Sequence, residues 1–166
     1  MRVPIRKAGK YTQLKLDHHI TGAKLKELKN TVDRLKKVSL PPAAQEVQRL
    51  AAMGDFSENA AYQMAKGRLR SINQRILELE DQVNHAVIIQ RPKATETIQI
   101  GHSVTVEINS KKKTYLILGS AEADPRAGII SQSSPIGSAL IGHKVGDRVT
   151  MQQAGKEITC RILTIE

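Results

Sequence analysis

The stretch YQMAKGRLRSINQRILELEDQVNHA, residues 62–86, carries the strongest periodic pattern in the chain. Its apolar residues recur at alternating spacings of three and four; they are Tyr62, Ala65, Leu69, Ile72, Ile76, Leu79, Val83 and Ala86. This is the period of an α-helix with one buried stripe, sustained over a length that is typical of coiled coils. The stretch therefore predicts a long helix that packs lengthwise against a second helix.

A second helical pattern precedes this stretch and runs from Thr21 to Met53. Thr21 suits the capping position of a helix. Apolar residues then follow at helical spacing, at Leu25, Leu28, Val32, Leu35, Ala43, Val47 and Leu50. Pro41 and Pro42 interrupt the pattern, and because proline lacks a backbone donor we expect a kink there and not a domain boundary. The two patterns together predict an antiparallel helical hairpin whose arms each span on the order of 45 Å.

The hexapeptide Gly54-Asp55-Phe56-Ser57-Glu58-Asn59 lies between the two helical patterns, so we expect it at the tip of the hairpin. Asp55 and Glu58 are three residues apart at a helix start, which is the spacing of a capping box. The same two carboxylates also suit a hard cation such as Mg²⁺, which prefers oxygen ligands. Two carboxylates alone make a weak metal site, so a second molecule would have to supply the other ligands. The spacing leaves both interpretations open.

Beyond Pro92, which we expect to end the second helix, the pattern changes to the two-residue period of strands. Residues 92–97 are predicted to be a linker and Lys111–Lys113 a charged turn. Ser134 and Pro135 suit the cap and first position of one short helix. Alternating apolar residues predict strands around Val104, Val106, Ile108, Tyr115, Ile117, Val149, Met151, Ile158, Cys160 and Ile162. The predicted fold class is α+β, with an N-terminal antiparallel coiled-coil hairpin and a small antiparallel sheet domain.

The composition indicates a polyanionic partner, because 26 basic and 16 acidic residues give a net charge of +10. Only one Phe and three Tyr are present, which argues against binding of single strands by stacking of bases on aromatic rings. Residues 1–20 are predicted to be a flexible basic arm. The lone Cys160 suits a buried thiol in a reducing compartment, and no stretch has the length of a membrane span, so we expect a cytoplasmic protein without a membrane partner.

Two separate motifs resemble those of a known family. The run GDFSENAAYQMAK, residues 54–66, is similar to the tip motif of the bacterial Gre transcript-cleavage factors, and SSPIGSALIGHKVGD, residues 133–147, is similar to their carboxy-terminal signature. The resemblance covers roughly residues 21–166. It implies a coiled-coil domain at 21–91, with its acidic tip at 54–59, and an FKBP-like domain at 98–166 that docks on RNA polymerase.

The resemblance also implies roles for individual residues. In the family the coiled coil enters the secondary channel of bacterial RNA polymerase, where the tip carboxylates hold Mg²⁺ and orient water so that the polymerase cleaves its own backtracked RNA. On this match Asp55 and Glu58 are the delivered ligands, and Ser57 and Asn59 form hydrogen bonds around them. Lys66 and Arg70, at positions i and i+4, are the implied contacts to the nascent RNA 3′ end. The implied docking residues are Ser134, Pro135 and Ile136.

Two function classes follow from these motifs, a third is weaker, and the net charge of +10 also leaves open a plain nucleic-acid-binding coiled coil. The first is a monomeric elongation factor that is not itself an enzyme, binds no cofactor alone and stimulates RNA cleavage with Mg²⁺ shared with polymerase. The second is a regulator that occupies the same channel and inhibits transcription. The third, a prolyl isomerase, is disfavoured because residues 93–166 contain one aromatic residue, Tyr115. Ala61 and the basic overall charge depart from the family and leave the RNA fragment length open.

Overall fold

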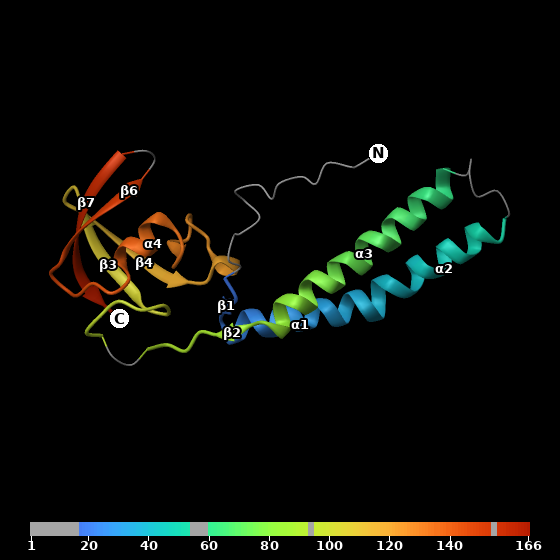
Figure 1. Ribbon diagram of the computed structural model, residues 1–166, viewed down its shortest axis with the longest axis horizontal. Helices are drawn as coiled ribbons and strands as arrows, with labels where there is room; N and C mark the ends of the chain where they lie inside the picture. The colour runs from blue at the N-terminus through green and yellow to red at the C-terminus, as the bar shows by residue number, and fades with distance from the viewer. Residues whose placement is uncertain (1–16, 54–59, 93–94, 154–155) are drawn as a thin grey trace, which may run out of the picture.

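The computed structural model describes residues 17–53, 60–92, 95–153 and 156–166. Figure 1 shows a long helical hairpin on one side and a small sheet domain on the other, joined at the base of the hairpin. The predicted α+β class is therefore confirmed. Two arms of helix form the hairpin, and a five-stranded sheet with one short helix forms the second part.

The first arm of the hairpin consists of α1, Gly22–Arg34, a π-helical segment, Leu35–Ser39, and α2, Leu40–Ala51. In the π-helical segment the N–H of Leu40 donates to the carbonyl of Leu35, five residues back. Pro41 and Pro42 follow at the first turn of α2, where a missing N–H costs little. The kink expected at the prolines stays a prediction, and the structure shows a widened helical turn just before them.

The second arm is α3, Ala60–Asn84. All eight apolar residues of the predicted stripe are buried or half-buried, and Leu79 is the most buried, at 1% exposed. Leu79 packs with Leu28 and Val32 of α1 and with Ile20 in one apolar cluster. The stripe therefore faces the first arm, as the periodicity predicts.

The base of the hairpin differs from the sequence prediction. The helix ends at Asn84, and Val87–Ile88 forms a strand, β2, that pairs in parallel with β1, His19–Ile20. The prediction that the second helix continues to Pro92 is wrong, because three β-branched residues from Val87 take up extended backbone and bond to β1. The prediction of a flexible arm is also wrong for its last four residues, 17–20, which belong to the fold; residues 1–16 lie outside the described part.

The five strands of the sheet are arranged in the order β5-β4-β3-β7-β6. Their bounds are Ser103–Ile108 for β3, Lys111–Leu118 for β4, Ile129–Ser131 for β5, Arg148–Gln153 for β6 and Lys156–Ile165 for β7. A short 3₁₀ turn, η2, covers Ser120–Glu122, and α4 covers Pro135–Leu140. The core lies between α4 and one sheet face, where the fully buried residues include Val104, Val106, Ile117, Leu140 and Ile162.

Two details of the sheet correct the sequence prediction. The sheet is mixed, because β5 pairs in parallel with β4 while the other pairs are antiparallel. Residues 119–128 carry the chain back before β5 begins, so β5 runs parallel to β4 and not antiparallel to it as expected. The charged turn predicted at Lys111–Lys113 is instead the first part of β4, and the turn is Asn109-Ser110, whose φ angles are 49° and 62°. Two-residue hairpin turns require such positive φ angles, and asparagine tolerates them well.

Candidate functional site

The far end of the hairpin is framed by the ends of two helices. α2 ends at Ala51 and α3 begins at Ala60, on the side of the hairpin that lies away from the sheet (Figure 1). The 25 residues of α3 correspond to about 37 Å of helix between its two ends. Asp55, Ser57, Glu58 and Asn59 stand between Ala51 and Ala60 in the chain and lie outside the described residues. Their implied roles therefore remain predictions.

Lys66 and Arg70 lie on one exposed side of α3, close to its first residue. Together with Gln63 and Gly67 they line a hollow of about 400 Å³. The ammonium of Lys66 lies 6.0 Å from the centre of the Tyr62 ring, at the outer range of a cation–π contact. The structure thus brings together the two cations that the i, i+4 spacing placed on one side.

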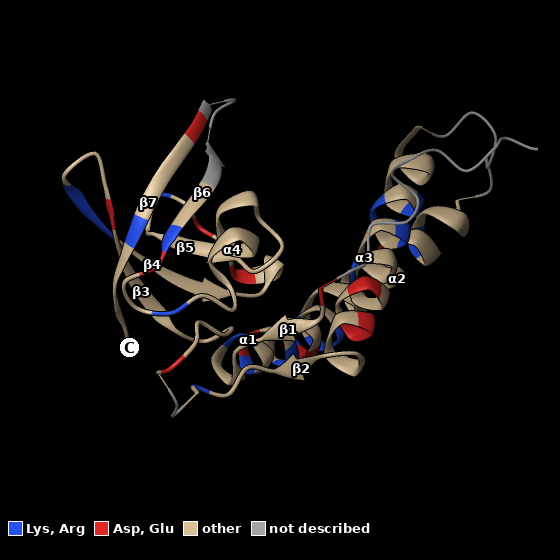
Figure 2. Cartoon of the chain, turned by 60° about the vertical axis from the view of Figure 1, so that its left-hand side comes forward, with Lys and Arg blue, Asp and Glu red and all other residues tan. Residues whose placement is uncertain are grey.

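Two neighbouring cations of α3 have other surroundings. Arg68 lines a separate hollow of about 250 Å³ between α2 and α3, beside Glu46 and Pro42. Arg75 forms an ion pair with Glu78, with 3.5 Å between the nitrogen and the oxygen. Lys66 and Arg70 therefore form a separate pair among the basic residues of α3. Figure 2 shows the basic residues along that helix in blue.

The predicted docking residues form the start of α4. The hydroxyl of Ser134 accepts from the N–H of Gly137 at 3.0 Å and donates to the carbonyl of Ser131 at 2.7 Å. Pro135 occupies the first helical position and is exposed, whereas Ile136 is half-buried against the core. The predicted cap and start of this helix are confirmed. Ser134 is tied into the local structure and Pro135 is open to a partner.

A set of polar contacts between the two parts of the molecule was not visible in the sequence. The carboxylate of Glu122 accepts from both the N–H and the hydroxyl of Thr21, each at 2.6 Å, across 101 residues of sequence. Thr21 is also the cap of α1, because its hydroxyl accepts from the N–H of Lys24. Neither Glu122 nor its turn belongs to a periodic pattern or motif, so no sequence signal pointed to this contact.

Asp17 makes the second contact at the junction between the hairpin base and the sheet domain. Its carboxylate accepts from the N–H of Ser120 at 2.9 Å, from the amide of Gln132 at 3.1 Å and from the N–H of His19 at 3.1 Å. Burial acts to raise the pKa of Asp17, but the hydrogen bonds from His19, Ser120 and Gln132 outweigh it, so the pKa lies below its ordinary value. Asp17 is therefore an ionised anchor between the hairpin base and the sheet domain.

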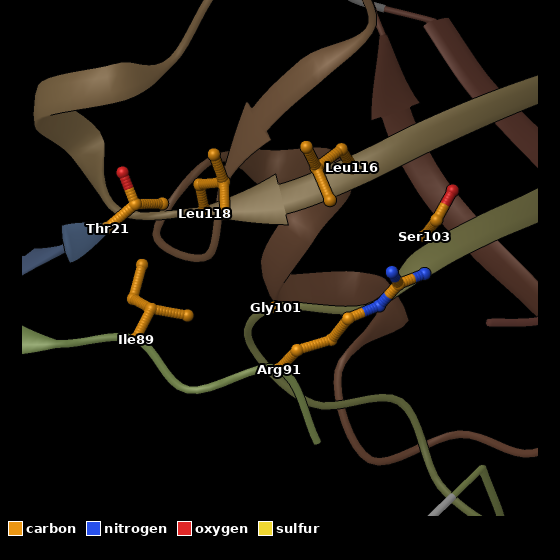
Figure 3. Close-up of a pocket in the computed structure, with 7 residues that line it drawn as sticks. All are labelled: Thr21, Ile89, Arg91, Gly101, Ser103, Leu116 and Leu118. Carbon is orange, nitrogen blue, oxygen red and sulfur yellow. The ribbon is translucent and has the colours of Figure 1, made fainter. Parts of the chain in front are cut away.

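The junction is close-packed on one side and hollow on the other. A Cβ at Gly119 would clash with the carbonyl oxygen of His19, so only glycine fits there. A pocket of about 400 Å³ opens between the hairpin base and the sheet, lined by Thr21, Ile89, Arg91, Gly101, Ser103, Leu116 and Leu118. Figure 3 shows the Arg91 side chain extending along this pocket toward Ser103. The lining is mainly apolar and holds no pair of groups suited to acid–base chemistry.

The part of the chain that the structure describes contains no group of three or more His, Cys, Asp or Glu side chains that could hold a metal ion. Within the same residues no helix combines the length and apolar character needed to cross a membrane. Cys160 is 1% exposed, which confirms the predicted buried thiol, and burial raises its pKa. The candidate site therefore consists of the hairpin end, the Lys66 and Arg70 pair, and the start of α4.

The fold and the site define a two-part protein in which a helix about 37 Å long separates the end of a helical hairpin from the base that joins a small sheet domain. Family models match both parts: "Transcription elongation factor, N-terminal" matches residues 18–88, and "Transcription elongation factor, GreA/GreB, C-term" matches residues 92–166. The chain belongs to the GreA/GreB family of transcription elongation factors.

Two relatives named GreA support this assignment. The chain is 37% identical to transcription elongation factor GreA of Geobacillus kaustophilus over 143 residues, which cover 84% of this chain and 90% of the relative. It is 35% identical to GreA of Thermomicrobium roseum over 149 residues, which cover 89% and 96% of the two chains. Among solved structures, GreA factor homolog 1 of Thermus thermophilus is 28% identical, covers 89% of this chain and 97% of its own, and has a TM-score of 0.40.

Proposed function

We propose that this protein binds bacterial RNA polymerase through the secondary channel and stimulates the Mg²⁺-dependent cleavage of backtracked RNA, which rescues arrested complexes. One observation carries the proposal. Asp55 and Glu58 stand in the chain between the end of α2 and the start of α3, in a member of the GreA/GreB family. The length of α3 supports it, because a rod of about 37 Å suits delivery of side chains into another molecule.

The carboxylates are oxygen donors of the kind that Mg²⁺ prefers, and as a pair they fit a shared site in which the polymerase supplies the remaining ligands. Mg²⁺ at such a site stabilises the charge on the attacking and leaving oxygens of the phosphodiester. Asp55 acts as a ligand, and Glu58 acts as a ligand or as the base that orients the attacking water. In the proposed complex with polymerase, Ser57 and Asn59 would supply hydrogen bonds around these carboxylates. The protein is not itself an enzyme, because the polymerase provides the rest of the catalytic centre.

Lys66 and Arg70 contact the extruded 3′ end of the nascent RNA. Their distance along α3 from Ala60 is about 9 Å and about 15 Å, so a strand that passes the tip meets them next. Their shared hollow of about 400 Å³ and their side-by-side positions suit phosphate groups. Ser134, Pro135 and Ile136 contribute to docking on the polymerase, with Pro135 as the exposed member.

The test adds the protein to a stalled, backtracked polymerase complex with Mg²⁺ and measures RNA shortening. We expect acceleration by the native chain and a loss of at least about tenfold in cleavage rate for Asp55→Asn and for Glu58→Gln, the scale of one lost charge contact in a transition state. Asp33→Asn, which changes an exposed carboxylate on the same arm, is the matched control and leaves the rate unchanged. Unchanged cleavage in Asp55→Asn refutes the proposal.

The same assay separates the inhibitory regulator from the cleavage factor. Transcription of a template without a stall shows whether the native chain slows synthesis. Inhibition there, together with no acceleration of cleavage in the backtracked complex, would assign the chain to the inhibitory class. The relatives named GreA do not favour that outcome.

A further inference from the structure

One line of charged residues crosses four strands of the sheet. Glu107 of β3 is paired in register with Lys112 of β4 and with Arg161 of β7. Arg161 is paired in turn with Arg148 of β6. Paired residues point to the same face, and the neighbours of Glu107 along β3 are buried in the core. The line therefore lies on the sheet face opposite α4.

The three cations of this line are exposed and available. Lys112, Arg148 and Arg161 are all exposed, and no ion pair involves any of them among the described residues. On β4, Lys111 and Lys113 are paired with the buried Ile108 and Val106 of β3, so they point away from this face, and the carboxylates of this face are Glu107 and Glu157. Figure 2 shows blue segments on β4, β6 and β7. We define the cationic sheet face as Lys112, Arg148 and Arg161.

The surroundings of these cations are polar and suited to phosphate. Arg148 and Arg161 line a hollow of about 300 Å³ together with Asn109, Ser110 and Thr159, and the acidic Glu107 lines it as well. Such hydroxyl and amide groups commonly bond phosphate oxygens. The single aromatic residue of β3, β4, β6 and β7 is Tyr115, which is buried in the core. The face therefore offers charge and hydrogen bonds but no platform on which unpaired bases could stack.

We propose that the cationic sheet face binds the backbone of double-stranded DNA. Lys112 and Arg148 are three strand spacings apart, about 14 Å between their backbones. The major groove of B-form DNA is about 12 Å wide, so the two ends of the line reach phosphates on both edges of the groove. The contact is independent of base sequence, because it uses phosphates and no base edges. This proposal does not depend on stimulation of RNA cleavage.

The test measures binding of the full chain, without polymerase, to a short fluorescent DNA duplex at about 50 to 200 mM salt. We expect the triple variant Lys112→Gln, Arg148→Gln, Arg161→Gln to bind at least about tenfold more weakly. The slope of log affinity against log salt falls by about 0.9 for each lost phosphate contact, near 2.7 for three. The matched control removes the same charge from exposed, unpaired cations of α1, as Lys26→Gln, Lys29→Gln, Arg34→Gln, and changes the affinity by less than about threefold.

A single variant tests the same idea without the loss of any cation. Glu107 lies between Lys112 and Arg161, so Glu107→Gln removes a repulsive charge and strengthens DNA binding by about three- to tenfold, at an effective dielectric typical of a protein surface. Circular dichroism and thermal unfolding confirm that each variant is folded.

Four results would overturn the proposal. An equal loss in both triple variants means that overall charge and not this face binds DNA. No gain in Glu107→Gln means that the line is not in contact with phosphate. Binding of polyglutamate as tight as binding of the duplex, lost in the same triple variant, would assign the face to an acidic protein partner. Tighter binding of an RNA duplex than of the DNA duplex would assign it to RNA.

Discussion

The contact between Glu122 and Thr21 gives a direct prediction about how the two parts of the molecule are held together. Glu122→Ala removes the carboxylate that accepts from both the N–H and the hydroxyl of Thr21, each at 2.6 Å. Hydrogen bonds to an ionised group contribute roughly 1.5–3 kcal/mol each. Both side chains are half-buried, so water replaces part of the lost interaction. We expect the junction to lose about 2 kcal/mol in stability.

Hydrogen exchange at the base of the hairpin measures this loss locally. The N–H groups of Val87 and Ile89 donate to the carbonyls of His18 and Ile20, so they report opening of the β1–β2 pair beside Thr21. A loss of about 2 kcal/mol raises their exchange rate by about 30-fold if they open with the junction. The corresponding shift of the melting temperature is about 4–8 °C.

Two comparisons make the result decisive. Glu122→Gln keeps a neutral acceptor and is expected to lose about half as much stability as Glu122→Ala. Glu96→Ala removes an exposed carboxylate without a hydrogen-bond partner in the described chain, and exchange at Val87 stays unchanged. A change in Glu122→Ala no larger than that in Glu96→Ala would refute the inference that Glu122 fixes the hairpin base.

Three further predictions follow from the packing and the charges. Because the pKa of Asp17 is lowered, its ionised form stabilises the fold above the ordinary pKa of 3.8. The stability advantage of the native chain over Asp17→Asn shrinks as the pH falls below that value. Urea unfolding across pH measures this advantage, and a difference that does not depend on pH would contradict the prediction. Gly67→Ala raises stability by about 1 kcal/mol, because a Cβ there meets nothing within 4 Å. Gly137→Ala lowers stability, because a Cβ there clashes with the carbonyl of Ser131. Equal effects of the two substitutions in thermal unfolding would contradict this prediction. Leu79→Ala, at a position 1% exposed, costs about 2–5 kcal/mol of unfolding free energy, and a loss below about 1 kcal/mol would mean that the hairpin seam packs elsewhere.

Local patterns in the sequence were sufficient to predict the elements that depend on residues within one or two helical turns. The stripe from Tyr62 to Ala86 identified the buried side of α3, because the helical period and apolar burial act along a single segment. The cap at Ser134 followed by Pro135 located the start of α4 for the same reason. The resemblance to the Gre factors rested on two runs of residues, and the family models match both parts of the chain.

The errors in the prediction occurred where pairing between distant segments overrides local preference. The short run after Asn84 continues a helical pattern in the sequence, yet it forms β2 because β1 lies beside it. Lys111–Lys113 is polar enough for a turn, yet it extends β4 because the turn closes at Asn109-Ser110. Both choices depend on hydrogen bonds to another strand, which a single segment does not encode.

The sequence by itself therefore determined the hairpin, the α+β class and the shared side of Lys66 and Arg70. Only the tertiary structure decided how the hairpin joins the sheet, through Glu122 and Thr21, 101 residues apart. It alone also aligned cations from three strands into one face, since strand register sets which side chains lie side by side. The physical reason is the range of the forces that act: periodicity reports burial along one element, whereas contacts between elements depend on how the whole chain folds back on itself.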